Sequence, residues 1–518
     1  MAGGKLMNVF KLSRADEPKE VLNWRLWLAV LTFGLCGAAR GIDEGLVSGV
    51  FSFQDFQRRL HINELGQSAF ANIKGNVTAM VNLGSIGGTL AWEGVGDTNP
   101  LHALILGIAI FMANGGHLGA VYAGRFIAGL GIGQTTVVAP VYLAEVAPPS
   151  VRGLCTCAFT GAVYLGIMLA YFANWACSIH MRDGLARWKE VPTTLHLMFA
   201  TIILALSFLV YESPRYLIKS GQDERAQVIL HKIRQSSPRD HPFVQREPAA
   251  IRLGLSEEQE ATRGTGFFGL VKEMFLIPGN LYRVYIGLGG QLLSQWSGGP
   301  SITIYAVNLF AILGVTGSNE SLFATAIFGV VKLVSAIIFN LDDLRCRLFD
   351  GSVEHRRQKP TPSEAQAATG AIVMIFLSGF GWAMGWNSMQ YLLTAELFPL
   401  RIRAAATSLV MCAHFANSYG NSRAVPNMLL PVSDGGLSPM GTFWMFSAVT
   451  ILGGIWVWVT IPETKGRSLE SMDVLFTLPW YKIGLYGNKH AVSGETYAQP
   501  EKKREDDVAE QEVVEHKN

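Results

Sequence analysis

Charged side chains are scarce in this chain, and its few cysteines show no regular spacing. Only 16% of its 518 residues are Asp, Glu, Lys or Arg, whereas 49% are hydrophobic, 55 are glycine and the mean hydropathy is +0.27. This composition excludes an ordinary soluble enzyme of this size and predicts a protein of the lipid bilayer. The six cysteines lack metal or disulfide spacing, so we interpret them as small packing residues.

Features that other classes of protein need are also missing. No nucleophile with a nearby base and no set of metal ligands accompanies the apolar stretches, so we expect no enzyme activity, no cofactor and no metal site. The amino-terminal segment is basic but has no apolar core followed by a cleavage site, so no signal peptide is expected. We expect no nucleic-acid partner, and we expect a monomer.

Long apolar stretches are abundant, and a polar segment divides them into two groups. Stretches of the first group lie near residues 26–51, 69–92, 101–118, 120–143, 154–177 and 193–211; those of the second lie near 284–313, 322–341, 370–393, 404–430 and 441–461. We therefore expect an amino-terminal segment (1–25), a first membrane half (26–211), a linker (212–282), a second membrane half (283–462) and a tail (463–518). The distribution of Lys and Arg predicts that the linker and both terminal segments are cytoplasmic.

The two membrane halves are copies of one unit. Glu145 in Ala-Glu-Val-Ala-Pro and Glu396 in the later Ala-Glu-Leu-Phe-Pro are 251 positions apart. Glu212 in Glu-Ser-Pro-Arg and Glu463 in Pro-Glu-Thr-Lys-Gly-Arg have the same separation of 251 positions. A duplicated bundle of membrane helices with parallel halves is typical of secondary transporters.

The repeat also predicts that one helix of the second half is missing. Moved by 251 positions, the third stretch falls on residues 352–369, which contain two prolines, two glutamates and a run of cations. Each such group would be costly in hydrocarbon. We therefore predict an all-α membrane fold of two six-helix halves without its ninth helix, in which polar residues 341–369 do not cross the bilayer. The later helices are expected to keep the orientation of a complete bundle.

Two opposite charges lie within apolar stretches of the first half. Arg125 is the second residue of the phrase Gly-Arg-x-x-x-Gly-x-Gly-x-Gly, whose glycines allow close helix packing. A cation at this depth requires a carboxylate partner, and Asp43 in the first stretch is the candidate. Asp43 opposed by Arg125 would suit a group that binds and releases a proton. The alternative is that Asp43 only pairs with Arg40 on the same helix face.

The phrases Gly-Arg-x-x-x-Gly-x-Gly-x-Gly, Pro-Val-Tyr-Leu-Ala-Glu (140–145), Glu-Ser-Pro-Arg and Pro-Glu-Thr-Lys-Gly-Arg together resemble the sugar porter family of the major facilitator superfamily, over residues 26–476. Residues 40–45, 291–298 and 420–426 are similar to the fungal branch of quinate and galacturonate permeases. The resemblance implies import of a monosaccharide, a sugar acid or a quinate-like compound by proton symport across the plasma membrane. Two alternatives stay open: a transporter-like nutrient sensor, and a transport-defective product of a truncated or mis-spliced gene.

The resemblance also assigns site residues. Asp43 and Arg125 match the proton-coupling pair of the first and fourth helices, and Gln295 matches a glutamine of the sugar site in the seventh. Ser294 and Pro300 stand where that site has Gln and Asn, so the hexose-type site is eroded. The substrate residues implied in this way are Thr160, Gln295, Trp296 and Tyr391, although the two aromatic residues would equally suit helix packing.

Charged residues at the helix ends match the cytoplasmic charge relay of the family, whose ion pairs lock the outward-open state. The relay comprises Glu145, Arg152, Glu212, Arg215, Glu396, Arg403, Glu463 and Arg467. The alternative is that these residues are solvated loop charges without a common role. The same charges recur at the offset of 251 positions in both halves, however, which argues against chance. The basic loop between the second and third helices is missing, because residues 93–100 contain no cation. Asn319 in Asn-Glu-Ser is an expected glycosylation acceptor in the outer loop between the seventh and eighth helices.

Overall fold

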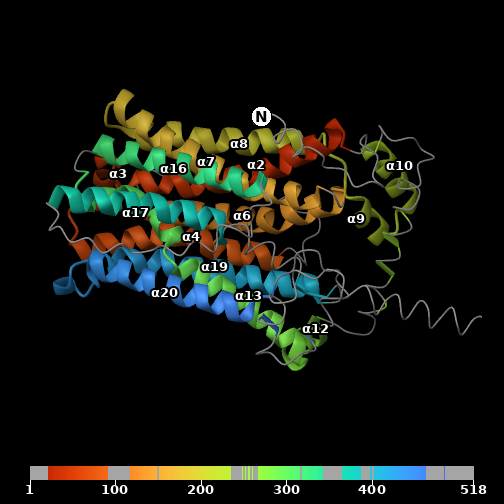
Figure 1. Cartoon of the computed structure of the whole chain (residues 1–518). Coiled ribbons are helices and arrows are strands. Elements are labelled where there is room, and N and C mark those ends of the chain that lie inside the picture. Colours follow the sequence, from red (N-terminus) through yellow and green to blue (C-terminus); the bar gives the residue numbers. More distant parts are fainter. Residues whose placement is uncertain are drawn as a thin grey trace, which may run out of the picture.

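The computed structural model describes residues 22–91, 117–148, 151–234, 267–315, 318–341, 364–386, 397–399 and 402–462, with short pieces at 248, 251–252, 255–256, 260, 476 and 483–484. Within these ranges the chain forms helices and no strand. The long helices lie side by side in one bundle, and α9 and α10 lie at one end of it (Figure 1). We call this end the linker end, and the opposite end, where α3 lies, the α3 end.

The amino-terminal half follows the predicted stretches to within a few residues. It contains α2 (Trp24–Val50), α3 (Gln54–Arg59), α4 (Gln67–Ala91), α6 (Leu118–Val146), α7 (Arg152–His180), the π-helical η2 (Ala186–Glu190) and α8 (Val191–Ser207). Helix α2 begins where the Asn23 side chain accepts hydrogen bonds from the backbone N–H groups of Arg25 and Leu26 (3.0 and 3.2 Å), as an N-cap does. Residues 101–116 of the predicted third stretch lie outside the described residues.

The linker folds into short helices at the linker end of the bundle. They are α9 (Pro214–Lys219), α10 (Asp223–Ile233) and α12 (Phe267–Leu276). Helix α9 contacts α6 of the first half and α10 packs on α9, whereas α12 packs on the helix of the second half that begins at Pro278. The Asn23 amide donates a hydrogen bond to the carbonyl of Ile233, and Arg234 Nη2 donates to the carbonyl of Val146 (3.0 Å). These bonds join the end of α10 to the beginning of α2 and the end of α6.

The carboxy-terminal half contains α13 (Pro278–Trp296), α14 (Gly299–Ile304), α15 (Ala306–Ile312), α16 (Ser318–Leu341), α17 (Glu364–Met384), α19 (Arg403–Met428), the 3₁₀ turn η4 (Val432–Asp434) and α20 (Ser438–Thr460). Six helices of the described residues, in both halves, have the length and apolarity needed to cross a bilayer. They are Trp24–Val50, Leu118–Val146, Leu154–His180, Ala186–Ser207, Asn319–Ile337 and Ser438–Thr460.

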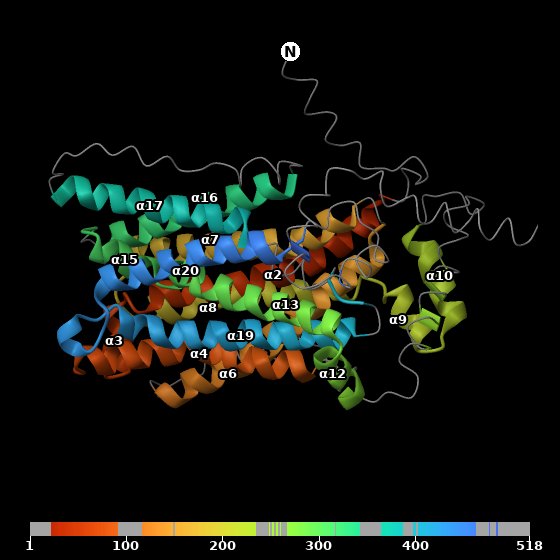
Figure 2. The ribbon, with the colours of Figure 1, turned by 60° about the horizontal axis from the view of Figure 1, so that its bottom comes forward.

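The two halves meet along two helix pairs, α4 with α19 and α7 with α16. Figure 2 shows α4 and α19 side by side along much of the bundle. Asn82 of α4 donates a hydrogen bond to Ser422 Oγ of α19 (3.4 Å), and Thr89 Oγ1 lies 3.2 Å from Cys412 Sγ. Higher residue numbers on α4 therefore face lower residue numbers on α19, so these two helices are antiparallel.

Glycine allows α4 and α6 to approach closely, as the sequence predicts. A Cβ atom on Gly129 would lie 2.2 Å from the carbonyl oxygen of Val81, and one on Gly133 would lie 2.3 Å from that of Ser85. Ser85 Oγ uses this proximity to donate a hydrogen bond to the carbonyl of Gly129 (3.0 Å). Close backbone contact of this kind is a usual way to pack helices in lipid, where no hydrophobic effect drives their association.

The predicted stretch 284–313 is not one helix but three. Helix α13 ends near Ser297, and Gly298 has φ +90°, a left-handed conformation that favours glycine. Pro300 lies in the first turn of α14, where its missing N–H costs nothing. A second break at Tyr305 separates α14 from α15. The pattern Ser-Gly-Gly-Pro therefore interrupts the first predicted stretch of the second half.

Each half contains a pair of neighbouring helices that run in the same direction. In the first half, Gly129 and Gly133 of α6 face Val81 and Ser85 of α4. Residue numbers therefore increase in the same direction along both helices. In the second, Phe376 of α17 packs on Phe328 of α16 (5.9 Å between ring centroids), and Lys332 lies 5.1 Å from the ring of Trp382. Parallel neighbours require the chain to return between them from one end of the bundle to the other.

Helix α16 therefore ends at the linker end, and α17 begins at the α3 end. A complete six-helix half has its ninth helix at this place, and α17 has the orientation expected for such a half. Residues 342–363 lie outside the described residues. Helix α17 begins at Glu364, so the end of the polar segment 341–369 is helical, and the expectation that this segment does not cross the bilayer stays a prediction.

Candidate functional site

Asp43 of α2 and Arg125 of α6 form a buried ion pair. Arg125 Nη1 donates to Asp43 Oδ1 and Nη2 donates to Oδ2, each at 3.1 Å, and the side chains are only 9% and 6% exposed for Asp43 and Arg125. Arg125 Nε donates to the carbonyl of Val77 in α4 (2.6 Å). The guanidinium thus joins three helices, and its fork binds both oxygens of the carboxylate. The structure brings these two residues together as the sequence predicts.

His196 of α8 lies beside this pair. It interacts electrostatically with Asp43 and Arg125. Its Nε2 is buried and has no hydrogen-bond partner among the described residues.

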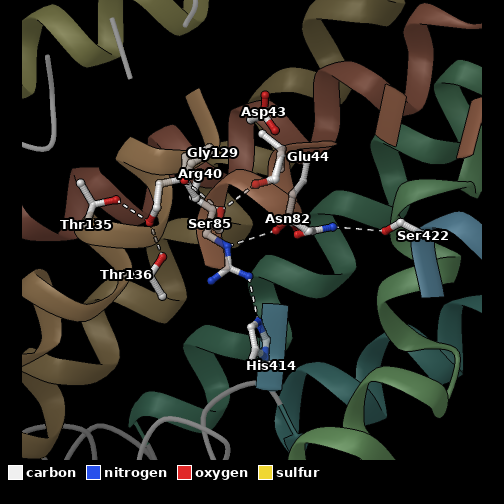
Figure 3. Close-up of polar contacts among 12 residues, drawn as sticks. Arg40, Asp43, Glu44, Asn82, Ser85, Gly129, Thr135, Thr136, His414 and Ser422 are labelled. Carbon is white, nitrogen blue, oxygen red and sulfur yellow. Dashed lines mark hydrogen bonds and ion pairs between the residues drawn. The ribbon is translucent and has the colours of Figure 1, made fainter. Parts of the chain in front are cut away.

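Arg40 does not pair with Asp43. Its Nε donates to Glu44 Oε1 at 3.1 Å, one turn further along α2, with side-chain exposures of 11% for Arg40 and 27% for Glu44. Figure 3 shows Asp43 apart from the contact that joins Arg40 and Glu44. Two separate ion pairs therefore lie on neighbouring positions of α2, and the alternative pairing considered from the sequence does not form.

Arg40 also reaches the second half of the molecule. Its Nη2 lies 3.4 Å from His414 Nε2 in α19 (Figure 3). Its guanidinium lies 5.4 Å from the ring of Phe415. Because Arg can only donate hydrogen bonds, Nε2 of His414 is the accepting nitrogen and Nδ1 carries the ring hydrogen. That hydrogen faces Gln291 Oε1 of α13, 2.9 Å away. A polar chain from Glu44 through Arg40 and His414 to Gln291 therefore crosses between the halves.

Gln295 lies one turn beyond Gln291 on α13, and part of its amide is unsatisfied. Its Nε2 is 3.3 Å from His414 Nδ1, but two donors cannot share a hydrogen bond. Gln295 Oε1 is buried and has no hydrogen-bond partner among the described residues. A buried amide in this state carries a free-energy cost that a ligand with hydroxyl groups would relieve.

A cluster of mostly polar residues adjoins Gln295 where the chain is broken between α13 and α14. It comprises Gln295, Pro300, Ser301, Ile304, Tyr305, Ser418, Asn421 and Ser422, which pack so closely that the space between them does not admit a water molecule. Ser301 Oγ donates to Asn421 Oδ1 (2.6 Å), and the Asn421 amide donates to the carbonyl of Gln295. Tyr305 Oη donates to the carbonyl of Ser422 (2.6 Å). Polar groups of α13, α14 and α19 thus converge on one place beside the interface of the halves.

The other predicted substrate residues have different surroundings. Trp296 Nε1 donates to Asn417 Oδ1 in α19 (3.3 Å), so it lies beside the same helix as His414 and Asn421. Thr160 of α7 is buried and donates to the carbonyl of Cys157 in its own helix (2.9 Å). Tyr391 lies outside the described residues. A contact with substrate stays a prediction for all of these residues.

Two phrases that contain relay residues meet at the linker end. Ser213 Oγ donates a hydrogen bond to Glu145 Oε2, and Tyr142 Oη donates to the carbonyl of Tyr211 (2.6 Å). Glu212, however, pairs with Arg225 of α10 (3.2 Å), and both side chains are about half exposed. A surface pair of this kind contributes little to stability.

The rest of the relay is described only in part. Arg215 lies in the first turn of α9, and Arg403 begins α19. Of Arg152 and Arg403 only the backbone belongs to the described part, and Glu396, Glu463 and Arg467 lie outside it. Asn319, expected in a loop, instead lies in the first turn of α16, where its Oδ1 accepts a hydrogen bond from Ser178 Oγ. The relay and the glycosylation stay predictions.

Sequence reasoning did not single out His414 or Lys332. Lys332 is almost fully buried in α16, donates to Thr303 Oγ1 and lies 4.8 Å from the ring of Tyr164 in the other half. Each residue is a titratable side chain within an apolar stretch. The same signal identified Arg125, so it could have identified these two.

Comparison with known proteins connects this geometry to transport. A model of the family "Sugar (and other) transporter" matches residues 29–341 and 356–476, and the unmatched 342–355 fall within the polar segment before α17. A quinate permease of Emericella nidulans is 28% identical over 490 residues, which cover 89% of this chain and 90% of the relative. A probable quinate permease of Neosartorya fischeri is 28% identical over 495 residues, 89% of each chain.

Solved structures share the fold. The proton:xylose symporter XylE bound to 6-bromo-6-deoxy-D-glucose superposes with a TM-score of 0.66 at 22% identity, covering 87% of this chain and 99% of that one. The partially occluded, inward-open XylE from E. coli gives 0.64 at 20% identity, covering 86% and 100%. The architecture is thus that of the major facilitator superfamily. This multi-pass membrane protein belongs to the sugar (and other) transporter family.

Proposed function

We propose that this chain imports a monosaccharide, a sugar acid or a quinate-like polyol acid by proton symport, as a monomer in the plasma membrane. The relatives named as quinate permeases and the neighbour named as a proton:xylose symporter support both parts of the proposal. In this orientation the linker end is cytoplasmic, and substrate enters from the α3 end.

The buried Asp43–Arg125 pair carries the proposal. As a carboxylate, Asp43 holds Arg125 through two charged hydrogen bonds and so ties α2 to α6. Protonation removes the negative charge and weakens both bonds, because hydrogen bonds between charged groups are about twice as strong as neutral ones. Proton binding therefore loosens one helix contact within the first half. Arg40 lies one turn away on α2 and contacts the second half, so a change at Asp43 is transmitted to the substrate site.

Uptake of labelled quinate into proteoliposomes with an imposed pH gradient tests the proposal. Asp43→Asn keeps the shape of the side chain and removes its proton, so this variant should exchange substrate downhill but fail to accumulate it. Asp183→Asn is the matched control, because Asp183 belongs to a half-exposed pair with Arg58 and should retain accumulation. Concentrative, pH-dependent uptake by Asp43→Asn would exclude proton coupling through this residue.

A transport-defective chain is the second candidate, because the sequence between α16 and α17 is rich in charges and prolines. The same assay separates the two functions. A rate for the wild-type chain that matches the Emericella nidulans quinate permease supports transport. A rate at the level of empty vesicles supports the defective product.

A further inference from the structure

Helix α14 is a segment of six residues with a break of the chain at each end. Gly298 precedes it in a left-handed conformation (φ +90°), and Tyr305 separates it from α15. Three residues of α14 and Tyr305 make up half of the cluster that adjoins Gln295, which is packed too closely to admit a water molecule. A solute can therefore reach the buried Oε1 of Gln295 through this cluster only when the cluster opens.

Of the elements that form this cluster, α14 is the one that can be displaced as a unit. Helix α19 is continuous over Arg403–Met428 and packs against both α4 and α13, and α13 is continuous up to Trp296. Changes of the backbone torsion angles at two breaks are enough to move a short helix between them, as happens at the hinges of moving domains. The contacts that hold α14 in place therefore determine whether the cluster is closed.

Thr303 of α14 is held from two sides. The hydroxyl of Tyr171 in α7 donates a hydrogen bond to the carbonyl of Thr303 (2.5 Å), and Lys332 Nζ of α16 donates to Oγ1 of the same residue. Thr303 lies in the last turn of α14, where a helix leaves its carbonyl groups without partners of its own. All three residues are no more than 3% exposed. The first half thus supplies a hydrogen bond to the end of α14.

Tyr171 belongs to the contact that closes the two halves toward the α3 end. Further along α7, the ring centroid of Trp175 lies 5.0 Å from that of Phe323 in α16. Nearer the α3 end, Ser178 Oγ donates to Asn319 Oδ1 in the first turn of α16. Figure 1 shows α7 and α16 side by side. The hydrogen bond from Tyr171 to α14 therefore exists only while the two halves stay closed here.

Other hydrogen bonds of this region join it to its own half. Ser301 Oγ donates to Asn421 Oδ1, and Tyr305 Oη donates to the carbonyl of Ser422, each at 2.6 Å and both to α19. These bonds lie within the second half, so a movement of the first half does not break them. The bond from Tyr171 differs because it breaks when the halves separate at the α3 end, which is the end where the solute enters under the proposed function.

We propose that Tyr171 is a positioning residue for transport: its hydroxyl fixes α14 in the closed cluster, and loss of this hydrogen bond as α7 moves away lets α14 move and expose Gln295 to the solute. Lys332 holds Thr303 from within the second half, so both halves act on α14 at one residue. This inference rests on the proposed function, because it describes how the place beside Gln295 opens. It depends neither on the identity of the solute nor on the coupling of transport to protons.

Hydrogen–deuterium exchange of the purified full chain tests the proposal without a substrate. Tyr171→Phe removes the hydroxyl and keeps the ring, so the backbone amides of α14 should exchange about fivefold faster or more, as expected when a buried carbonyl loses its partner. Tyr282→Phe is the matched control, because the buried Tyr282 donates to the carbonyl of Thr460 (3.1 Å) within the second half. It should leave the exchange of α14 unchanged. Equal exchange of α14 in the wild type and in a folded Tyr171→Phe overturns the proposal.

A second variant acts on Tyr171 without altering it. A Cβ atom on Gly329 of α16 would lie 3.0 Å from Cδ2 of Tyr171 and 3.1 Å from Cα of Met168, so Gly329→Ala pushes α7 away from α16. If Tyr171→Phe does not yield folded protein, Gly329→Ala should still speed the exchange of α14. Gly370→Ala in α17 is its control, because a Cβ there meets nothing within 4 Å. Exchange of α14 that is the same in both glycine variants contradicts the proposal.

Equilibrium binding separates a positioning role from a general loss of stability. The probes are quinate and D-xylose, and the comparison uses whichever of them the wild type binds. Release of α14 raises the fraction of molecules that can bind, so Tyr171→Phe should bind the probe several-fold more tightly than the wild type. Tyr282→Phe should bind it no more tightly than the wild type. Unchanged or weaker binding by Tyr171→Phe would overturn the positioning role.

The proposed function and this inference can fail separately. Faster exchange of α14 in Tyr171→Phe, together with no concentrative uptake by the wild type, would refute proton symport and leave this inference intact. Concentrative uptake by the wild type, together with unchanged exchange of α14 in Tyr171→Phe, would do the reverse. If the wild type binds neither probe, the exchange experiment decides.

Discussion

The ion pair between Asp43 and Arg125 should behave as one energetic unit. Both side chains are less than a tenth exposed, and Arg125 makes three hydrogen bonds at 2.6 to 3.1 Å. Removal of one partner from a buried pair costs about 3–5 kcal/mol, because the remaining charge stays buried without compensation. At 2–4 °C per kcal/mol for a unit the size of one half, Arg125→Gln or Asp43→Asn should lower the melting temperature by roughly 6–20 °C.

The double variant Asp43→Asn with Arg125→Gln removes both charges at once. It should be more stable than the sum of the single losses predicts, by about 2 kcal/mol or more. Thermal unfolding of the purified protein at pH 7, followed by tryptophan fluorescence, completes the cycle. The exposed pair Arg58–Asp183, with exposures of 59% and 33%, is the control and should give less than about 1 kcal/mol. Strictly additive losses at Asp43 and Arg125 would refute the idea of a coupled pair.

Two further predictions concern packing and pH. Gly129→Ala should destabilise the protein by about 1–3 kcal/mol, because its Cβ would lie 2.2 Å from the carbonyl oxygen of Val81. Gly119→Ala is the control, because a Cβ there meets nothing within 4 Å. Equal melting temperatures of the two variants would contradict this prediction. Burial tends to raise the pKa of Asp55 in α3, but hydrogen bonds from Trp188 and Arg59 and the nearby arginine charges lower the pKa below its ordinary 3.8 overall. Its stabilising contribution should therefore be present above pH 3.8 and disappear as the pH falls through the lowered pKa. The difference in melting temperature between wild type and Asp55→Asn should narrow in that range, and a constant difference would exclude this role.

The Asp43–Arg125 pair could be predicted because a charge in an apolar helix has few possible partners. The two side chains meet because each buried charge needs an opposite charge beside it, and not because of a local sequence pattern. Close packing of α4 with α6 followed from glycine spacing for a similar reason. The long helices were recognisable because lipid demands apolar segments of nearly constant length.

Other parts of the site could not be predicted in this way. The contact of Arg40 with His414 depends on how α19 is rotated against α2, and a sequence that is polar on several faces does not determine that rotation. The pairing of Glu212 with Arg225 depends on the path of an exposed linker helix, where many partners have similar energies. The break at Gly298 was visible as Ser-Gly-Gly-Pro, but glycine is also common in uninterrupted membrane helices.

The parallel arrangement of α16 and α17 determines which compartment every later residue faces. If the chain did not return between them, α17, α19 and α20 would all be inverted, and Arg403 would lie at the opposite end of the bundle. In the first half, the sequence between α4 and α6 contains an apolar stretch, which the bilayer would accept as a membrane segment. In the second half, the sequence between α16 and α17 contains charges and prolines instead. The sidedness of the last three helices is therefore encoded by packing: α17 packs against α16, α19 against α4 and α13, and α20 against α13 and α19. Substitutions in these interfaces should affect membrane topology as well as stability.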